Sequence, residues 1–284
     1  MSYRQYEPVE LRKLQLVSTK ILQEFDRVCT ELEIPYYACA GTALGSVRHG
    51  GFIPWDDDID VSMLRPDFER FLNEAPAAVG DDFEIVSGRN EPFFPACNAN
   101  LALKGTLCVP EEFDSCPFRY PIGIGIYPMD RVSASQKTLK RQLRRTWFWT
   151  RISFLRATPR PHLFIKGWRR ILVSAACHIA YWGMRILHIS PVWIHRNWEK
   201  AATLAESEDV NLFADFTDMH PLDWSITREE MFPLKRSKFE SIEINLPNAI
   251  DAILTRGYGD YMQLPPEEDR KNHYPSVMDF GRFN

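Results

Sequence analysis

Residues 40–61 read AGTALGSVRHGGFIPWDDDIDV and carry the densest local signals in the chain. A short apolar run, residues 36–40, leads into a Gly41-Thr42 turn, and residues 58–61 alternate between polar and apolar as a strand does. Because side chains alternate across a strand, Asp58 and Asp60 point to the same face, about 6–7 Å apart. The stretch therefore predicts a turn beside a strand that presents two carboxylates.

Two carboxylates at this spacing repel each other, which raises a pKa unless a cation lies between them. Hard oxygen ligands suit Mg²⁺ or Mn²⁺, and these ions in turn bind phosphate oxygens. The alternative is a solvated acidic turn, since residues 56–60 contain four aspartates. Ile59 and Val61 flank Asp60 as in a strand that enters a core, so the residues favour a metal site at Asp58 and Asp60.

The Gly41-Thr42 turn has two interpretations of its own. A turn of this kind after an apolar strand leaves backbone N–H groups free at a helix start, where they can hold phosphate. It can also do no more than shape the chain. The chain has no Walker loop, no Gly-x-Gly-x-x-Gly, no His-Glu-x-x-His and no Gly-x-Ser-x-Gly element, which removes the common nucleotide-hydrolase, dinucleotide, zinc-protease and esterase classes.

Around this stretch the chain alternates between helical and extended patterns. Apolar residues at helical spacing predict an amphipathic helix over residues 8–32, and shorter helices are expected over residues 43–47, from Pro66 and over residues 247–256. Further strands are expected at residues 83–86, 101–103, 106–109, 122–127 and 241–244. Strands and helices mix without a steady βαβ rhythm, so we expect an α+β fold.

Charge is segregated along the chain. The net charge is −4, yet residues 131–198 contain 14 Lys or Arg, no Asp or Glu, and six of the eight tryptophans. This composition predicts three parts: a core over residues 1–130, a basic, Trp-rich helical insertion over residues 131–198, and a C-terminal part over residues 199–284 that completes the core. Two or more helices, broken near Pro159 and Pro161, are expected in the insertion.

The insertion suggests a membrane surface. Its longest uncharged run, residues 171–184, is shorter than the ~20 residues that a spanning helix needs. Cationic, Trp-rich helices of this length are typical of interfacial binding to anionic lipid. A helical bundle with solvated charges, or a patch for an anionic polymer, are the alternatives, and the mild overall acidity argues against nucleic-acid binding.

The N-terminal residues and the cysteines indicate a compartment. Residues 1–13 contain no apolar segment of the secretory type, and six cysteines are sparse for 284 residues. Reduced thiols are therefore expected rather than a disulfide framework. We expect the protein in the cytosol, peripheral to the cytoplasmic face of the membrane.

Residues 40–61 closely resemble the signature of the LicD family, phosphocholine transferases of bacterial cell-surface glycans that are distantly related to fukutin and fukutin-related protein. A second block, residues 258–268 with the sequence YGDYMQLPPEE, resembles the C-terminal signature of the family, and Arg270 and His273 follow it. The resemblance implies a nucleotidyltransferase-type fold, in which a Gly-Thr turn and an Asp-x-Asp strand hold a metal-bound nucleotide.

The resemblance also implies a reaction. An activated donor such as CDP-choline gives its phosphocholine to a sugar hydroxyl, and CMP is released. The acceptor would be a cell-surface glycan, such as lipopolysaccharide or teichoic acid, or its lipid-linked precursor. Phosphoryl-type transfer depends on positioning and charge neutralisation, which a metal on two carboxylates supplies. Transfer of a nucleotide itself, as in antibiotic-modifying relatives of the fold, is a less favoured alternative.

The chain departs from the family at one position. The family has a third carboxylate in a segment that resembles Ile-Asp-Ile-Phe-Pro-Leu-Asp, whereas residues 124–130 read IGIYPMD, with Gly125 at the place of the acid. The third acid can act as base on the acceptor hydroxyl. Asp130 is one candidate to replace it, and Asp114 or Asp56 are others. A catalytically silent family member, acting as a membrane-associated glycan-binding or assembly subunit, is the alternative function.

Further site residues follow from position and resemblance. Arg48 and His49 lie between the turn and the acidic strand and would touch donor phosphates together with Gly41 and Thr42; a solvated loop pair is the alternative. Lys104 matches a basic position of the family and would neutralise phosphate, or it lies at a strand edge without a role.

An aromatic group is the last candidate. Trp55, Tyr258 and Tyr261 would form a box for a trimethylammonium group by cation–π attraction; ordinary core packing is the alternative. Arg270 and His273 are expected to close the site or to cap the fold.

Overall fold

A mixed sheet of seven strands forms the centre of the computed structural model, which describes residues 5–161 and 165–283. Five strands follow one another in the order β1-β2-β6-β4-β3: β1 (Tyr37–Ala38), β2 (Asp60–Leu64), β6 (Gly123–Arg131), β4 (Ala99–Leu103) and β3 (Phe83–Ser87). The far end of β6 also pairs with β7 (Leu212–Ala214), which pairs with β8 (Ile226–Thr227). Strands β2 and β6 run parallel, and the other described pairs are antiparallel. This mixed architecture confirms the predicted α+β class.

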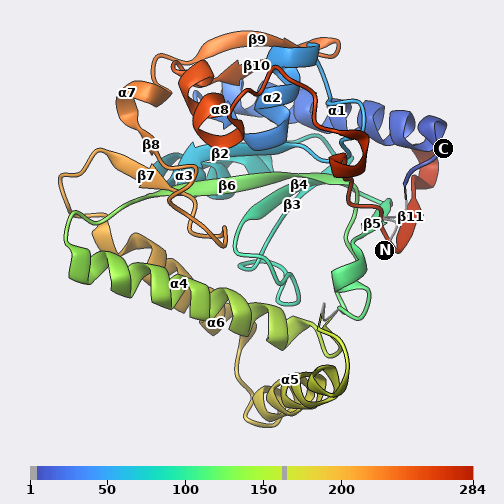
Figure 1. The fold of residues 1–284 in the computed structure, drawn as a ribbon, viewed down its shortest axis with the longest axis vertical. Coiled ribbons are helices and arrows are strands. Elements are labelled where there is room, and N and C mark those ends of the chain that lie inside the picture. Colours follow the sequence, from blue (N-terminus) through green and yellow to red (C-terminus); the bar gives the residue numbers. More distant parts are fainter. Residues whose placement is uncertain (1–4, 162–164, 284) are drawn as a thin grey trace.

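Helices cover both sides of the sheet (Figure 1). On one side lie α1 (Pro8–Glu31), α2 (Ala40–His49) and α8 (Ile250–Tyr258), and on the other lie α4 (Gln136–Ala157) and α6 (Pro191–Ala202). Helix α3 (Arg65–Glu74) follows β2 directly. The predicted amphipathic helix at residues 8–32 is confirmed by α1, whose Leu14, Ile21 and Phe25 are at most 2% exposed and bury its apolar face.

The C-terminal residues return to the first half of the chain. The hairpin of β9 (Lys235–Phe239) and β10 (Ile242–Leu246) packs beside α2 and β1. Ser46 of α2 donates a hydrogen bond to the carbonyl of Lys238, and Phe52 packs on Phe239. Strand β11 (Val277–Asp279) pairs with β5 (Leu107–Val109). A short helix, α7 (Arg228–Met231), connects β8 to this region.

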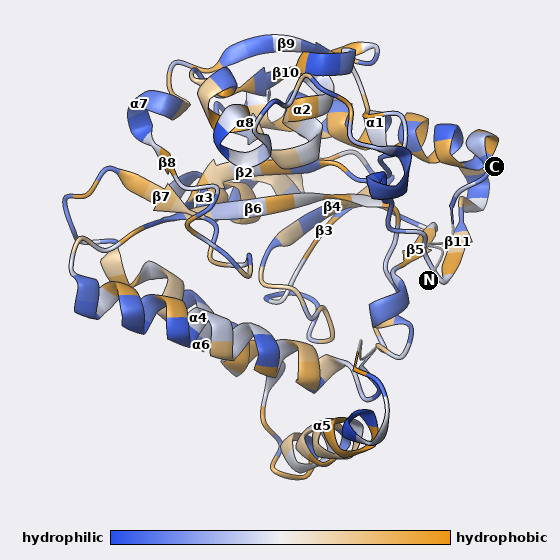
Figure 2. Cartoon of the chain, in the orientation of Figure 1, coloured by the Kyte–Doolittle hydropathy of each residue, from blue (hydrophilic) through white to orange (hydrophobic). Residues whose placement is uncertain are grey.

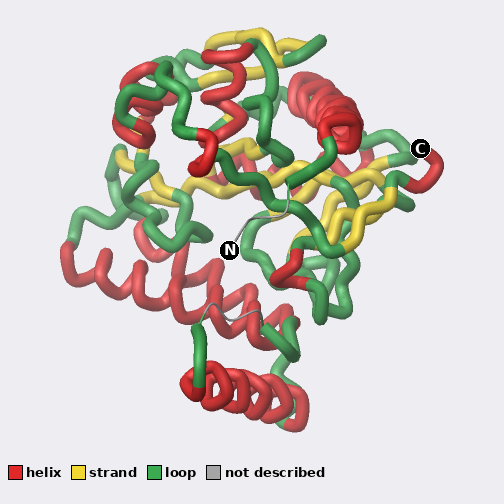
Figure 3. Tube along the Cα trace, turned by 45° about the vertical axis from the view of Figure 1, so that its right-hand side comes forward, coloured by secondary structure: helices red, strands yellow, loops and turns green. Residues whose placement is uncertain are grey.

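The basic segment is helical, as predicted. It forms α4, α5 (Trp168–Ile186) and α6, with Ser135 and Ser190 as hydrogen-bonding N-caps. Helices α4 and α6 pack together, and the buried Gln142 donates to the carbonyls of Arg131 and Ala202. Helix α5 lies beyond them, at the end of the molecule remote from α1 (Figures 1 and 3). Of the helices in the described part of the chain, none has both the length and the apolar character that a membrane span requires.

A buried ion pair joins α3 to the central strand. Asp130 on β6 is 0% exposed, and Arg65 at the start of α3 donates to both of its carboxylate oxygens at 2.7 Å. The geometry is the two-pronged one that guanidinium and carboxylate prefer. Both carboxylate oxygens of Asp130, which was predicted as a catalytic residue, therefore accept hydrogen bonds from Arg65.

Removal of one partner from this pair should destabilise the fold. Asp130→Ala leaves the buried guanidinium with only its longer contact to Glu69, so we expect the free energy of unfolding to fall by about 3–5 kcal/mol. Urea unfolding followed by circular dichroism measures the loss. Arg27→Gln, which breaks exposed ion pairs on α1, serves as the control and should cost no more than about 1 kcal/mol. Equal losses for the two variants would contradict the structural role of Asp130.

Candidate active site

The Gly-Thr pair and the strand that carries Asp60 are joined by a hydrogen bond. Helix α2 begins at Ala40, earlier than predicted, so Gly41 and Thr42 lie in its first turn. The Thr42 hydroxyl accepts a hydrogen bond from the Asp60 N–H at 2.8 Å. A Cβ atom on Gly41 would lie 2.7 Å from a carboxylate oxygen of Asp56, so only glycine leaves room for that carboxylate beside the positive end of the helix.

The remaining aspartates have different partners. Asp57 accepts hydrogen bonds from the Tyr6 hydroxyl at 2.8 Å and from the His273 N–H at 3.0 Å, and it is fixed in a structural role. The side chain of Asp58 is 47% exposed, and its Oδ2 lies 3.4 Å from Nδ1 of His273. His273, which follows the second signature block, is thus brought to Asp58, and Asp58 lies before β2 and not on the strand as predicted.

This cluster holds more negative charge than its surroundings balance. Burial, and then the neighbouring Asp58, raise the pKa of Asp56 to about 8, and the same two causes raise the pKa of Asp60. The pKa of Asp58 is raised as well, because its half-exposed carboxylate is partly withdrawn from water and lies beside Asp57. The hydrogen bond to Asp57, followed by the nearby charges, raises the pKa of His273 to about 9. Carboxylates that resist ionisation together favour a cation between them.

The donor set suits a metal that the substrate helps to bind. Within residues 5–161 and 165–283, no three His, Cys, Asp or Glu side chains form a complete metal site. Asp58 and Asp60 offer carboxylate oxygens from neighbouring positions of one chain segment. Mg²⁺ is commonly held by one or two carboxylates plus substrate phosphates and water, so this pair fits such an ion.

Gly125 and Tyr127 lie beside Asp60, where the resemblance to the family led us to expect a third acid. Gly125 on β6 is the direct neighbour of Asp60 on β2. A Cβ atom on Gly125 would lie 2.6 Å from Oδ1 of Asp60 and 2.7 Å from the ring of Tyr127. Tyr127 hydrogen-bonds Asp60 and lowers the pKa of that carboxyl against the larger effect of burial. The sequence analysis missed Tyr127, although it stands two residues after Gly125 and so on the same face of the strand.

The two signature blocks meet at a large hollow beside Asp56. It has a volume of about 900 Å³. The predicted residues among those that line it are Gly41, Arg48, Trp55, Tyr258, Tyr261 and Arg270. Arg48 donates to the Tyr261 carbonyl at 2.7 Å, and the Arg270 guanidinium lies 4.7 Å from the centre of the Trp55 ring. Aromatic and cationic groups from distant segments are therefore assembled around one space.

Of the predicted residues that do not line this hollow, three remain to be placed. His49 neighbours Arg48, and its pKa is lowered by burial and then by that guanidinium. Lys104 donates to the Asp81 carbonyl at 2.9 Å. Asp114 accepts a hydrogen bond from Ser276 at 3.0 Å.

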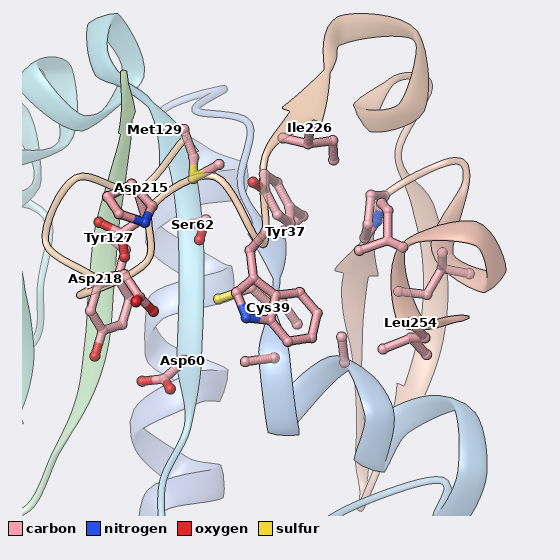
Figure 4. A pocket seen from close by; sticks show the side chains of 18 of the residues that line it. Tyr37, Cys39, Asp60, Ser62, Tyr127, Met129, Asp215, Asp218, Ile226 and Leu254 are labelled. Atoms are coloured by element: carbon pink, nitrogen blue, oxygen red, sulfur yellow. The ribbon is translucent and has the colours of Figure 1, made fainter. Parts of the chain in front are cut away.

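A second cavity, of about 270 Å³, borders Asp60 (Figure 4). Tyr127, Asp215 and Trp224 line it together with residues of β1 and α8. Asp215 directly follows β7. Neither Asp215 nor Trp224 was predicted, because no sequence pattern indicated that residues 212–226 lie beside β6.

The acidic segment and the Gly-Thr pair lie together as the resemblance to the LicD family leads us to expect, and comparison with known proteins supports that resemblance. Residues 33–90 match the model of the LicD/FKTN/FKRP nucleotidyltransferase domain. The chain is 26% identical to the lipopolysaccharide cholinephosphotransferase LicD of Haemophilus influenzae over 270 residues, which cover 93% of this chain and 96% of that protein. The resemblance to the LicD family is thereby confirmed.

Two uncharacterised proteins match shorter parts of the chain. One, from Rickettsia typhi, is 33% identical over 73 residues, 26% of this chain and 23% of that protein. The other, from Rickettsia prowazekii, is 38% identical over 48 residues, 17% of this chain and 18% of that protein.

Gly125 should tolerate no side chain while Tyr127 keeps its position. For Gly125→Ala we expect a loss of about 1–3 kcal/mol in the free energy of unfolding, because the new methyl group overlaps Asp60 and Tyr127. Gly183→Ala on α5, where a Cβ meets nothing within 4 Å, is the matched control and should not destabilise. Urea unfolding measures both.

A double variant tests whether the Tyr127 side chain fills the space that an acidic side chain at position 125 would need. Gly125→Asp alone should destabilise at least as much as Gly125→Ala, whereas Gly125→Asp with Tyr127→Ala removes the ring that the new Cβ atom would overlap and should cost less than the two single changes added together. Unfolding of the single and double variants decides between the outcomes. Additive losses in the double variant would show that Tyr127 does not occupy the place of the acid.

Proposed function

We propose that this protein transfers phosphocholine, or a similar substituted phosphate, from a CDP-activated donor to a hydroxyl of a cell-surface glycan or its lipid-linked precursor, with release of CMP. The observation that carries the proposal is the meeting of both signature blocks at the acidic strand. The similarity to a lipopolysaccharide cholinephosphotransferase along nearly the whole chain supports transferase activity and this substrate class.

The residues suggest a division of tasks. Asp58 and Asp60 would hold Mg²⁺ or Mn²⁺, which supplies charge neutralisation at the transferred phosphate. Arg48 and Arg270 add positive charge around the nucleotide in the large hollow. Asp56 borders that hollow, and burial raises its pKa to about 8; a metal bound at Asp58 and Asp60 would favour its ionised form, which could then accept the proton of the acceptor hydroxyl.

Loss of either metal-binding carboxylate should slow turnover strongly. For Asp58→Asn and Asp60→Asn we expect kcat to fall about a hundredfold or more, because transition-state charge loses its counterion. Release of CMP from CDP-choline, CDP-ribitol or CDP-glycerol, with Mn²⁺ and a candidate acceptor, provides the assay. Asp209→Asn, at an exposed position outside the site, is the control and should retain full activity.

Wild-type protein that releases no CMP from any of these donors in a metal-dependent reaction would overturn the proposal. Gly125 then favours the second candidate, a catalytically silent family member that binds glycan at the membrane. Binding of the acceptor glycan without turnover would support that candidate.

Docking at the anionic cytoplasmic face of the membrane completes the proposal. Helix α5 carries an apolar stripe, six side chains that recur at helical spacing and are each between 49% and 72% exposed: Trp168, Ile171, Leu172, Ile179, Trp182 and Ile186. Figure 2 shows hydrophobic residues along α5, at the end of the molecule remote from the sheet. Arg169 and Arg185 lie on either flank of this stripe by helical geometry. An apolar stripe with cationic flanks suits the interface of an anionic bilayer.

Two substitutions in the stripe should release the protein from anionic vesicles. For Ile171→Ser with Ile179→Ser we expect at least tenfold weaker binding to phosphatidylglycerol-containing vesicles, since less apolar area is buried. Co-sedimentation measures it. Val9→Ser with Leu16→Ser, at exposed apolar positions of α1, is the matched control. Equal affinity of both double variants would refute docking through α5.

A further inference from the structure

Three hollows meet at the acidic strand. The large hollow reaches Asp56, the cavity of about 270 Å³ reaches Asp60, and a third space of about 310 Å³ reaches Asp58, Asp60 and Gly125. Transfer of a substituted phosphate brings three organic groups to one phosphorus: the nucleotide that leaves, the head group that moves and the acceptor that receives it. Each group therefore needs a space of its own beside the metal-binding carboxylates.

The cavity beside Asp60 has an unusual lining (Figure 4). Aromatic rings of Tyr37, Tyr127 and Trp224 contribute to its wall, and no described residue that lines it is a Lys, Arg or His. Three carboxylates border it, those of Asp60, Asp215 and Asp218. In Figure 4 the acidic residues lie toward one side of the cavity, while Ile226 and Leu254 lie toward the other.

Asp215 lacks a countercharge in the described part of the chain. It accepts a hydrogen bond from the Thr217 N–H at 2.7 Å, but no ion pair joins it to a described basic side chain. Burial raises its pKa to about 7, although the hydrogen bonds from Thr217 lower it. Burial of a carboxylate without a neighbouring cation is unfavourable, and a cationic ligand in the cavity would offset that penalty.

We propose that this cavity binds the quaternary ammonium head group of the donor, an inference that rests on the proposed function. Methyl groups around a positive charge match aromatic faces through cation–π attraction, and the charge itself is balanced by Asp215 and Asp218. A neutral polyol head group would leave both the carboxylates and the apolar wall unmatched. The charge of the cavity thus selects choline over ribitol or glycerol.

The large hollow suits the cation less well. Arg48 and Arg270 line it, and their charges repel an ammonium group. The guanidinium of Arg270 already covers the face of Trp55. Tyr258, expected in the same aromatic box, packs on Trp224 with ring centres 5.0 Å apart, so it supports the wall of the smaller cavity.

The backbone makes room for Trp224. A Cβ atom on Gly257 would lie 1.9 Å from the Trp224 ring, so the absence of a side chain there lets the indole pack against α8. Arg256 donates to the Ser225 carbonyl at 2.9 Å and fixes the segment that carries the indole. Trp224 is consequently held as a preformed wall.

Choline itself is the first probe. We expect choline chloride, titrated into the full chain by calorimetry, to bind at least tenfold more weakly to Trp224→Leu and to Asp215→Asn than to the wild type. Trp224→Phe keeps an aromatic face and should retain most of the affinity, which separates ring loss from misfolding. Trp193→Leu, at an exposed tryptophan of α6, is the matched control and should bind as the wild type does.

Donor selection is the second readout. The two weakened variants should raise KM for CDP-choline at least tenfold and leave KM for CDP-glycerol unchanged. Unchanged choline affinity in both variants, or a loss of affinity caused by Trp55→Leu instead, overturns the proposal. Wild-type protein without turnover on any CDP donor would refute the proposed function, and the choline titration would still test the cavity separately.

Discussion

Mutual repulsion among four neighbouring carboxylates is the constraint on which the rest of this structure depends. The elements around residues 56–60 each offset part of this repulsion. Helix α2 offers its positive end to Asp56, Tyr6 and His273 donate to Asp57, and Thr42 fixes the backbone of Asp60. Asp58 and Asp60 remain as the two carboxylates that we propose to bind a metal, which would supply the positive charge that transfer of a phosphate group requires.

Local patterns were sufficient to predict much of this arrangement. Apolar spacing predicted α1, alternation predicted the strand that carries Asp60, and two short blocks predicted that Arg270 and His273 belong near the acidic segment. Each of these features is encoded within one continuous stretch of chain. The start of α2 lay three residues before its predicted position, because the Gly-Thr pair forms the first helical turn rather than a separate turn.

Features that arise from distant segments could not be predicted. From the sequence, Asp130 was predicted to be a catalytic acid. Because β2 and β6 run parallel, however, Arg65, which directly follows β2, lies beside Asp130 and forms an ion pair with it. Asp215 and Trp224 stand in a segment without strong periodicity and reach the cavity only because β7 pairs with the far end of β6. Tyr127 could not be predicted for the same reason, since its contact with Asp60 depends on the register between β2 and β6.

The contacts of Asp57 bear on how the protein is made. One donor, Tyr6, precedes α1, and the other, His273, comes close to the end of the chain. During synthesis the sheet and its acidic strand can form long before residue 273 leaves the ribosome, so a nascent chain passes through a stage with Asp57 only half satisfied. Asp57 can therefore acquire both hydrogen bonds only after residue 273 has been synthesised.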